Sequence, residues 1–392
     1  MVRPFAGIRV VEVGGTLAAG AATKTLSDYG ADVIKVEPPA GGEIRRLPPF
    51  PDDRPHVDTG ACHLALDTGK RSVVVDLGTA SGREVLGRLA AGAQLLVLHL
   101  APDEAERVLS LVGEDGPSTV AITAHGLQGP FRDRLENDMS MFAWTTRMQH
   151  HGFAGEEPLR YAPHAATIQV GATAAAAGAA AIWAREHEGG RAALEVAGVE
   201  ALAGNVDQFF VLWSFSGAEM PRPGAGAARA GYPAGTHRCA DGYVVFASGA
   251  DSFARLCAGM GRPELATDPR FADPAARAEH GDAFRSYFEP WISARTRDQV
   301  FTQLQATGVM VAPILDTSEM LVDRQVQARG SFVQVDQPGV GVHTIAGPPF
   351  RMPDGWEARP APALGEHTVE VLDALGYSRD EQIALFRVGA IA

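Results

Sequence analysis

The N-terminal segment alternates between two hydrophobic periodicities, and this alternation limits the possible folds more than any other feature. Residues 8–13 form an apolar, β-branched run that predicts a strand. Gly14 and Gly15 follow, and residues 16–29 have the Ala- and Leu-rich pattern of a helix. Residues 32–37 predict a second strand. A strand, a helix and a strand in this order favour a parallel pair of strands joined by a crossover helix.

The same alternation continues to about residue 125. Further strands are expected at residues 71–77, 94–100 and 119–123, with an amphipathic helix at 80–91 and another after Asp103. This part of the chain is therefore expected to form an α/β fold with an open, Rossmann-like sheet. An alanine-rich helix is expected at roughly residues 168–186, where small side chains permit close packing.

The chain changes character after residue 215. Residues 221–231 form a Gly-, Ala- and Pro-rich linker, residues 232–248 have the pattern of a hairpin, and helices predominate over residues 251–329. A chain of 392 residues is too long for one ordinary core. We expect a large Rossmann-like domain from residues 1–224 and 331–392, and a smaller α+β domain from residues 225–330.

Composition and charge exclude several classes of partner. The net charge of −13 opposes binding to nucleic acids and anionic lipids. Cys62, Cys239 and Cys257 are widely separated and form no CxxC pair, which favours a reduced cytoplasmic setting. The sequence begins without a charged and then apolar leader, and its longest apolar run, residues 170–184, is mostly alanine and too short to span a bilayer. We therefore expect a cytoplasmic protein.

The residues carry few motifs of known chemistry. The turn at Gly14 and Gly15 precedes a helix whose N-terminus could bind a phosphate, but this is a weak signature and a plain tight turn is the favoured interpretation. The patterns GxGxxG, GxxxxGK[ST], GxSxG and HExxH are absent. His150 and His151 are adjacent and face different directions on regular structure, so no metal site is expected. These residues alone indicate a two-domain α/β enzyme with a turn that could accept an anion.

Several blocks of sequence, in a fixed order, resemble the class III CoA-transferases of the CaiB/BaiF type. They are FAGIRVVE (5–12), GADVIKVEPP (30–39), LALD with GKRS (64–72), GPFRDR (129–134), GRPEL and DPRF (261–271), AGPPFR (346–351) and LGEHT (364–368). The resemblance implies a large Rossmann-like domain built from both chain ends, a small middle domain, and two chains interlocked as a homodimer. It also implies a coenzyme A thioester as substrate and no prosthetic group.

The resemblance further implies a set of contacts to CoA. Residues that match the family's CoA-binding positions are Thr16, Leu17, Ala18, Lys35, Pro38, His99 and Arg107. Lys35 and Arg107 would offer positive charge to the nucleotide phosphates, although Lys35 could also be a solvated residue at a strand end.

The position of the family's nucleophile holds a different residue here. In the transferases, an aspartate before the small-residue helix attacks the acyl-CoA and forms an anhydride and then an aspartyl-CoA thioester. With Gly171 as anchor, this position falls on Thr167, and residues 159–185 contain no Asp or Glu. His164 is three residues away and is a candidate base for the Thr167 hydroxyl. Alternatively, Thr167 only caps the helix that follows.

Other residues of the expected site also differ from the family pattern. Related racemases use a histidine in a Gly-His-Asp triplet, whereas residues 136–138 read Glu-Asn-Asp, which retains Asp138. His99 stands where the family has an asparagine. His99, His150, His151 and His164 could form a replacement proton-transfer set, or they could be ordinary polar residues of a solvated cleft.

Three functions remain open from the sequence. The family default is CoA transfer from an acyl-CoA to a carboxylic acid. The first alternative is a lyase, dehydratase or isomerase on the same fold that uses histidine acid–base chemistry. The second is a catalytically silent subunit that pairs with an active paralogue or only binds a ligand.

Overall fold

The chain forms two compact units in the computed structural model, which describes residues 3–113, 115–153, 155–204, 208–220, 222, 233–247, 252–352 and 356–392. The first unit comprises Met1–Thr145, Tyr161–Asp207 and Arg324–Ala392, and the second comprises Thr146–Arg160 and Gln208–Asp323. Both chain ends therefore belong to the first unit. These limits differ from the expected domain limits at residues 225 and 330, which remain a prediction. Of the expected linker, residues 221–231, only Arg222 lies among the described residues.

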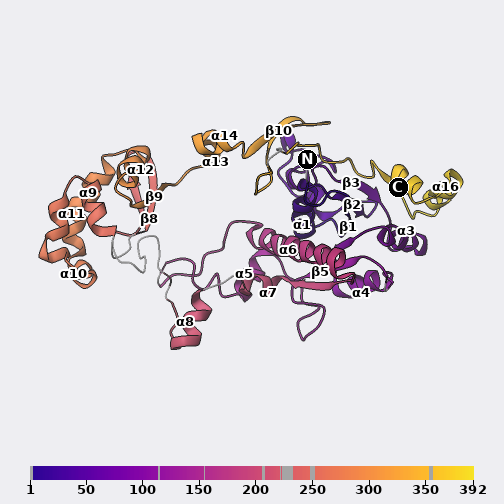
Figure 1. Ribbon diagram of the computed structural model, residues 1–392, viewed down its shortest axis with the longest axis horizontal. Coiled ribbons are helices and arrows are strands. Elements are labelled where there is room, and N and C mark those ends of the chain that lie inside the picture. Colours follow the sequence, from indigo (N-terminus) through magenta and orange to yellow (C-terminus); the bar gives the residue numbers. More distant parts are fainter. Residues whose placement is uncertain are drawn as a thin grey trace. The chain divides into compact units, whose positions relative to one another are not determined.

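The first unit is an α/β structure with one large sheet and a separate hairpin (Figure 1). Its strands are β1 (Arg9–Val13), β2 (Asp32–Glu37), β3 (Arg71–Val74), β4 (Leu95–His99), β5 (Ser118–Thr123), β6 (Ala193–Ala197), β10 (Phe332–Gln337) and β11 (Gly341–Ala346). Its helices are α1 (Leu17–Asp28), α2 (Ala61–Leu66), α3 (Ala80–Ala91), α4 (Pro102–Ser110), α5 (Asp138–Trp144), α6 (Ala165–Glu188), α7 (Gly198–Gly204), α14 (Arg324–Arg329), α15 (Thr368–Ala374) and α16 (Arg379–Arg387), with short 3₁₀ turns η1 (Glu43–Arg46) and η2 (Pro51–Asp53).

The large sheet confirms the expected parallel, Rossmann-like arrangement. Its six strands run in the order β3-β2-β1-β4-β5-β6, and every neighbouring pair is parallel. Val11 of the central strand β1 lies opposite Ile34 on one side and Leu96 on the other. The strand order reverses between β1 and β4, and a crevice for ligands forms at the carboxyl ends of strands at such a point. The sequence did not predict β6, whose residues alternate less clearly between buried and exposed.

Helices α1 and α6 pack so closely that their backbones nearly touch. A Cβ added at Gly171 of α6 would lie 2.7 Å from Ala21 Cβ and 2.8 Å from the Ala18 carbonyl oxygen of α1. The alanine-rich sequence therefore serves close packing, as expected.

Helix α6 has 24 residues, Ala165–Glu188, and is therefore longer than the helix expected at roughly residues 168–186. By length and composition it is the one described helix that could cross a membrane. Its contacts with α1 and with β4, β5 and β6 show that it is a core helix of the first unit.

The second unit combines a small antiparallel sheet with helices. Its strands are β7 (Gly235–Cys239), β8 (Gly242–Ala247) and β9 (Met310–Pro313), in the order β7-β8-β9. Its helices are α8 (Gln208–Ser216), α9 (Phe253–Gly259), α10 (Pro274–Glu279), α11 (Gly281–Ser293), α12 (Arg297–Gln305) and α13 (Thr317–Val322), with 3₁₀ turns η4 (Pro263–Thr267) and η5 (Pro269–Phe271). The expected hairpin is present as β7 and β8, and Phe246, Phe271, Phe284 and Phe288 contribute to the core.

The close approach of α1 and α6 gives the first testable prediction. Gly171→Ala should lower the free energy of unfolding by about 1–3 kcal/mol, because the added methyl group overlaps α1 and forces the helices apart. Gly87→Ala is the matched control, since a Cβ at this position in α3 meets no atom within 4 Å. It should raise the free energy of unfolding by about 0.5–1 kcal/mol through helix propensity. Urea unfolding followed by circular dichroism measures both, and equal shifts would contradict the packing.

Candidate functional site

The candidate site lies where the strand order of the large sheet reverses. Gly14 and Gly15 leave the end of β1, and His99 ends the neighbouring strand β4. Gly14 has a φ of 115°, and a Cβ there would overlap the carbonyl oxygen of His99. Glycine is therefore required for the two strand ends to come this close. The turn brings Thr16, the N-cap of α1, beside His99.

A cavity of about 270 Å³ opens at this point, entirely within the first unit. Its lining comes from the ends of β4 and β5, the starts of α1, α5 and α6, and the loop around η1. The lining residues are Thr16, Leu17, Ala18, Glu43, Leu47, His99, Ile122, Thr123, Ala124, Glu136, Asn137, Asp138, Met141, His164, Thr167 and Val170. The fold thus brings together seven of the residues named from the sequence: Thr16, Leu17, Ala18, His99, Asp138, His164 and Thr167.

Thr16 and His99 form a hydrogen-bonded pair across the strand reversal. Thr16 Oγ1 lies 2.7 Å from His99 Nδ1, and it also accepts the first-turn amide of Ala19 at 3.4 Å. Burial lowers the pKa of His99 to about 4. The imidazole is therefore neutral at neutral pH, which makes it a hydrogen-bonding group instead of a positive charge.

Asp138 and Thr167 form a second pair on the α5 and α6 side of the cavity. Asp138 Oδ1 accepts hydrogen bonds from the Thr167 amide at 2.9 Å and from Thr167 Oγ1 at 3.0 Å. Asn137 caps α5 and fixes the start of this helix through bonds to the amides of Met139 and Ser140. Asp138 Oδ2 has no hydrogen-bond partner in the described part of the chain. A carboxylate therefore lies next to the side chain at the start of α6.

The neighbouring carboxylate, Glu136, is held by other groups. Its Oε1 lies 2.8 Å from His125 Nε2 and accepts the indole hydrogen bond of Trp144 at 3.0 Å. The rings of His125 and Trp144 meet edge to face at 5.5 Å. Neither His125 nor Trp144 matches a sequence motif, so neither was predicted as a site residue.

His164 has a strained backbone at the cavity wall. Its φ is 65° and its ψ is 0°, which is the left-handed region that non-glycine residues seldom adopt. It precedes α6 without capping it through its side chain. Strain of this kind at a cavity wall is characteristic of functional positions.

Lys35 does not fit the expected role in binding phosphates. Its side chain is fully buried, and its Nζ lies 3.1 Å from Glu37 and 2.5 Å from Asp67. The same cluster contains Lys70, which bonds Asp67 and Glu12, and Arg45, which bonds Glu37. The ammonium group of Lys35 therefore balances the buried carboxylates of Glu37 and Asp67, and Lys35 does not line the cavity.

The other predicted residues lie outside the cavity lining. Pro38 and Arg107 are exposed in the first unit and do not line the cavity. His150 and His151 belong to the second unit, where His150 Nδ1 lies 2.9 Å from the Met220 carbonyl oxygen and its ring stacks on Phe209 at 4.0 Å. The catalytic or binding roles of these residues remain predictions.

Part of the lining was not predicted from the sequence. Ile122, Thr123 and Ala124 line the cavity at the end of β5, and the rule that ligands bind at the carboxyl ends of parallel strands could have found them. Glu43 and Leu47 come from an irregular loop, which carries no comparable signal. Among the described residues, no group of three or more His, Cys, Asp or Glu is arranged to hold a metal ion.

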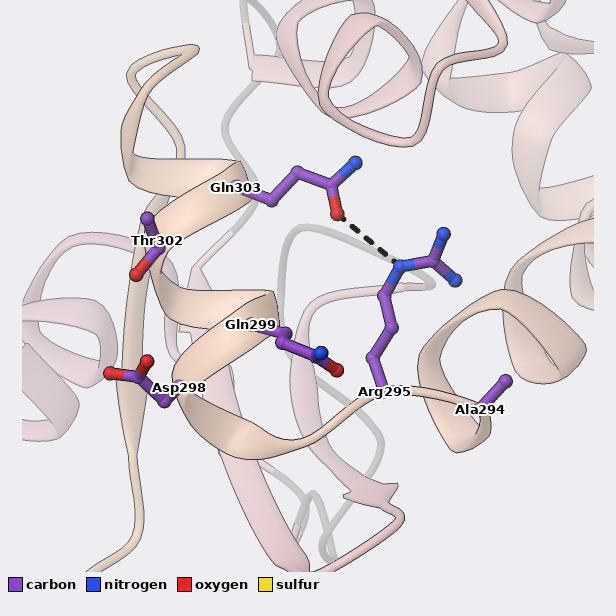
Figure 2. Close-up of a pocket in the computed structure, with 6 residues that line it drawn as sticks. All are labelled: Ala294, Arg295, Asp298, Gln299, Thr302 and Gln303. Atoms are coloured by element: carbon purple, nitrogen blue, oxygen red, sulfur yellow. Dashed lines mark hydrogen bonds between the residues drawn. The ribbon is translucent and has the colours of Figure 1, made fainter.

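The second unit has a hollow of a different kind. Figure 2 shows Arg295 and Gln303 facing each other beside α12, with a hydrogen bond of 3.3 Å from Arg295 Nε to Gln303 Oε1. Ala294, Asp298, Gln299 and Thr302 complete its lining. Arg295 also donates to the Trp291 carbonyl oxygen, and Gln299 accepts from the Thr296 amide, so these groups serve the local helix structure. The lining forms no constellation of acid, base and nucleophile, and the cavity of the first unit is the better candidate.

Comparison with known proteins decides the family. A family model described as CoA-transferase family III matches residues 5–368. The chain belongs to this family. Subunit BbsE of succinyl-CoA:(R)-benzylsuccinate CoA-transferase from Thauera aromatica is 31% identical, with 100% of this chain and 99% of the relative covered. Succinyl-CoA–D-citramalate CoA-transferase from Chloroflexus aurantiacus is 29% identical over 97% of this chain and 96% of the relative.

A solved structure supports the same assignment. The crystal structure of a CaiB/BaiF family protein from Brucella suis matches with a TM-score of 0.82 and 28% identity, covering 96% of this chain and 100% of that one. The resemblance inferred from the sequence blocks is confirmed. Enzymes of this family use CoA thioesters as substrates, and the family implies no prosthetic group.

The buried position of Lys35 gives a prediction that separates structure from ligand binding. Lys35→Met should lower the free energy of unfolding by about 3–5 kcal/mol, because it removes one of the cations that balance the buried carboxylates of Glu37 and Asp67. Arg54→Met is the control, since it also replaces a cation by methionine, but at an exposed position of the first unit, and the change should be about 0.5 kcal/mol or less. Urea unfolding measures both. A stable Lys35→Met protein with weakened CoA binding would restore the phosphate-binding role.

The same cluster predicts a dependence of stability on pH. Burial opposes ionisation of Glu37, but Lys35 and Arg45 lower its pKa to about 2. The unfolded chain binds this proton at its ordinary value near 4.5, so the contribution of Glu37 to stability is full above that pH. It should be lost progressively as the pH falls towards 2. Unfolding free energies measured between pH 6 and about 2 should show this loss, and its absence in Glu37→Gln would assign the loss to Glu37.

Proposed function

We propose that this chain binds an acyl-CoA thioester in the cavity of the first unit and transfers CoA to a carboxylic acid, with Asp138 as the acyl acceptor. One observation carries the proposal: Thr167, at the position expected for the family's aspartate, donates two hydrogen bonds to Asp138 Oδ1. A carboxylate oxygen thus occupies the start of α6, although it comes from α5. Its second oxygen, Oδ2, has no partner among the described residues and is available for attack.

The reaction requires no metal or redox cofactor. Asp138 Oδ2 attacks the thioester carbonyl carbon, the C–O bond forms as the C–S bond breaks, and CoA leaves as a thiolate. The thiolate then attacks the Asp138 carbonyl of the anhydride, which releases the donor acid as a carboxylate and leaves an aspartyl-CoA thioester. An acceptor carboxylate reverses these two steps and departs as its own CoA thioester.

The names of relatives support a choice of substrate to test. The relatives described above use succinyl-CoA as CoA donor according to their names. A succinate–glutarate CoA-transferase from Agrobacterium fabrum is 30% identical over 95% of this chain and 96% of the relative. Succinyl-CoA with a dicarboxylic acid acceptor is therefore the first pair to assay.

The proposal predicts the effect of removing the Asp138 carboxylate. Asp138→Asn should lower the rate of CoA exchange between succinyl-CoA and glutarate by about 10⁴-fold or more, because the amide is not a nucleophile. Mass spectrometry after hydroxylamine treatment of the protein with succinyl-CoA should find a hydroxamate on the peptide that contains Asp138.

The control for this experiment is Asp133→Asn, which makes the same chemical change at an exposed carboxylate. It should retain the wild-type rate. Trapping of the acyl group on a different side chain, or full activity of Asp138→Asn, would refute the role of Asp138.

A second candidate function is that of a subunit in a heteromeric transferase. The observation that favours it is the threonine at position 167 together with relatives named as subunits, including BbsE and the alpha and beta subunits of succinyl-CoA–L-malate CoA-transferase. In this case the chain alone should not exchange CoA, and co-expression with a family member that has the aspartate should yield an active complex.

A third candidate uses histidine acid–base chemistry, since His99 and His164 both line the cavity. Such an enzyme would convert one acyl-CoA without an acceptor acid. Incorporation of deuterium from solvent at the α-carbon of the acyl group would distinguish it from a transferase.

Assembly as an interlocked homodimer in the cytoplasm is also part of the proposal. Helix α8 supports an assembly, because it exposes four large apolar side chains: Phe210, Val211, Trp213 and Phe215. Light scattering on the purified chain measures its oligomeric state directly.

A further inference from the structure

The hydrogen bonds of Thr16 determine which nitrogen of His99 carries the proton. Thr16 Oγ1 accepts the Ala19 amide as the cap of α1 and lies 2.7 Å from His99 Nδ1. The hydroxyl proton has no other acceptor among the described residues. If Nδ1 carried a proton, Thr16 Oγ1 would accept twice and its own proton would have no acceptor among the described residues. The arrangement that satisfies every group has Thr16 donating to Nδ1, which leaves the ring proton on Nε2.

The Nε2 atom is available to a ligand. It has no hydrogen-bond partner in the described part of the chain, and it is not among the buried polar atoms without a partner. Since Nδ1 is bonded to Thr16 and the ring lines the cavity, Nε2–H is the group that His99 can offer to a molecule bound there. Burial keeps the ring neutral, because it lowers the pKa of His99 to about 4.

We propose that Thr16 holds His99 in the Nε2–H tautomer, and that this N–H donates a hydrogen bond to the carbonyl oxygen of the bound thioester. The inference rests on the proposed function for the identity of the ligand. When a nucleophile attacks the acyl carbon, this oxygen gains negative charge, and a fixed neutral donor stabilises that charge without the reorganisation that water would need. His99 is then a catalytic residue, and Thr16 is a positioning residue.

The surroundings of His99 suit an oxygen that gains negative charge. Leu17 and Ala18 also line the cavity, and their amides lie in the first turn of α1, where helix geometry provides no acceptor for them. The carboxylates of the cavity, Glu43, Glu136 and Asp138, come from other elements. The end of β4 and the start of α1 therefore form the donor side of the cavity.

The experiment compares two CoA compounds that differ in the carbonyl group. The first is a ketone analogue of succinyl-CoA in which CH₂ replaces the thioester sulfur, so that the carbonyl remains and cannot be cleaved. The second is free CoA, which has no acyl carbonyl. His99→Phe should raise the Kd of the ketone analogue about fivefold and leave the Kd of free CoA within about twofold of the wild type. His99→Gln, whose amide can donate, should recover most of the affinity.

The control for these variants is His187→Phe. His187 is exposed near the C-terminal end of α6 and stacks on Trp183, which a phenyl ring can also do. It should bind both compounds like the wild type. With succinyl-CoA and glutarate, His99→Phe should lower kcat/KM by about 10²- to 10³-fold, as expected for the loss of one donor to an oxyanion.

The tautomer is tested on the wild-type protein without any activity measurement. The ¹⁵N chemical shifts of the His99 ring distinguish a protonated Nε2 from a protonated Nδ1. Thr16→Ser keeps the hydroxyl and should preserve the Nε2–H tautomer and the selectivity for the ketone analogue. Thr16→Val removes the hydroxyl and should populate the Nδ1–H tautomer and reduce that selectivity.

The outcomes separate this inference from the proposed function. A proton on Nδ1 in the wild type, or equal loss of affinity for the ketone analogue and free CoA in His99→Phe, would overturn the inference. If the wild-type chain binds the ketone analogue selectively through His99 but exchanges no CoA, the inference stands and the transfer reaction is wrong. If His99→Phe does not fold, the inference is tested instead by the ¹⁵N chemical shifts of the His99 ring in the wild type and by the comparison of Thr16→Ser with Thr16→Val.

Discussion

The parallel pairing of β1 with both β2 and β4 is the constraint on which the rest of the first unit depends. Because the strand order reverses at β1, the chain leaves the ends of β1 and β4 in different directions and a crevice remains between them. Gly14 permits the backbones to approach at this point. The hydrogen bond between Thr16 and His99 then joins two residues 83 positions apart in the chain. The residues that line the cavity come from strand ends, helix starts and a loop that lie around this reversal of strand order.

A cluster of buried charged side chains from β1, β2 and the segments that follow β2 supports the same part of the first unit. Lys35, Lys70 and Arg45 neutralise Glu12, Glu37 and Asp67 where water cannot, and the side chains are fully buried. Such a cluster contributes little net stability compared with apolar packing, but the loss of one member leaves a buried charge without a partner. The GADVIKVEPP block, which identified the family, thus contributes Lys35 and Glu37 to the architecture and not to the cavity lining.

Local patterns in the sequence were sufficient to predict most of the large sheet, because β1, α1 and β2 are set by periodicity within short segments. Strand β6 was missed because residues 193–197 lie at the sheet edge and are partly exposed, so their alternation is weak. The site was predicted only in part, since its hydrogen bonds are non-local. The partners Asp138 and Thr167 are 29 residues apart, and no spacing rule connects α5 to the start of α6. The burial of Lys35 within β2 could not be predicted either, because it depends on partners such as Asp67 that the local sequence does not indicate.

The neutrality of His99 bears on the nucleophile as well as on the carbonyl oxygen. A positively charged imidazole in a cavity with three carboxylates would attract one of them and reduce the ability of that carboxylate to attack a thioester. Burial disfavours the charged ring, and the bond from Thr16 uses Nδ1, so His99 offers one N–H donor and no net charge. Under the proposed reaction, His99 does not compete for Asp138 during the attack, and the developing oxyanion still finds a donor. A threonine at position 167 is compatible with Asp138 as nucleophile and His99 as donor. It supplies hydrogen bonds to Asp138 Oδ1 and leaves Oδ2 without a partner among the described residues.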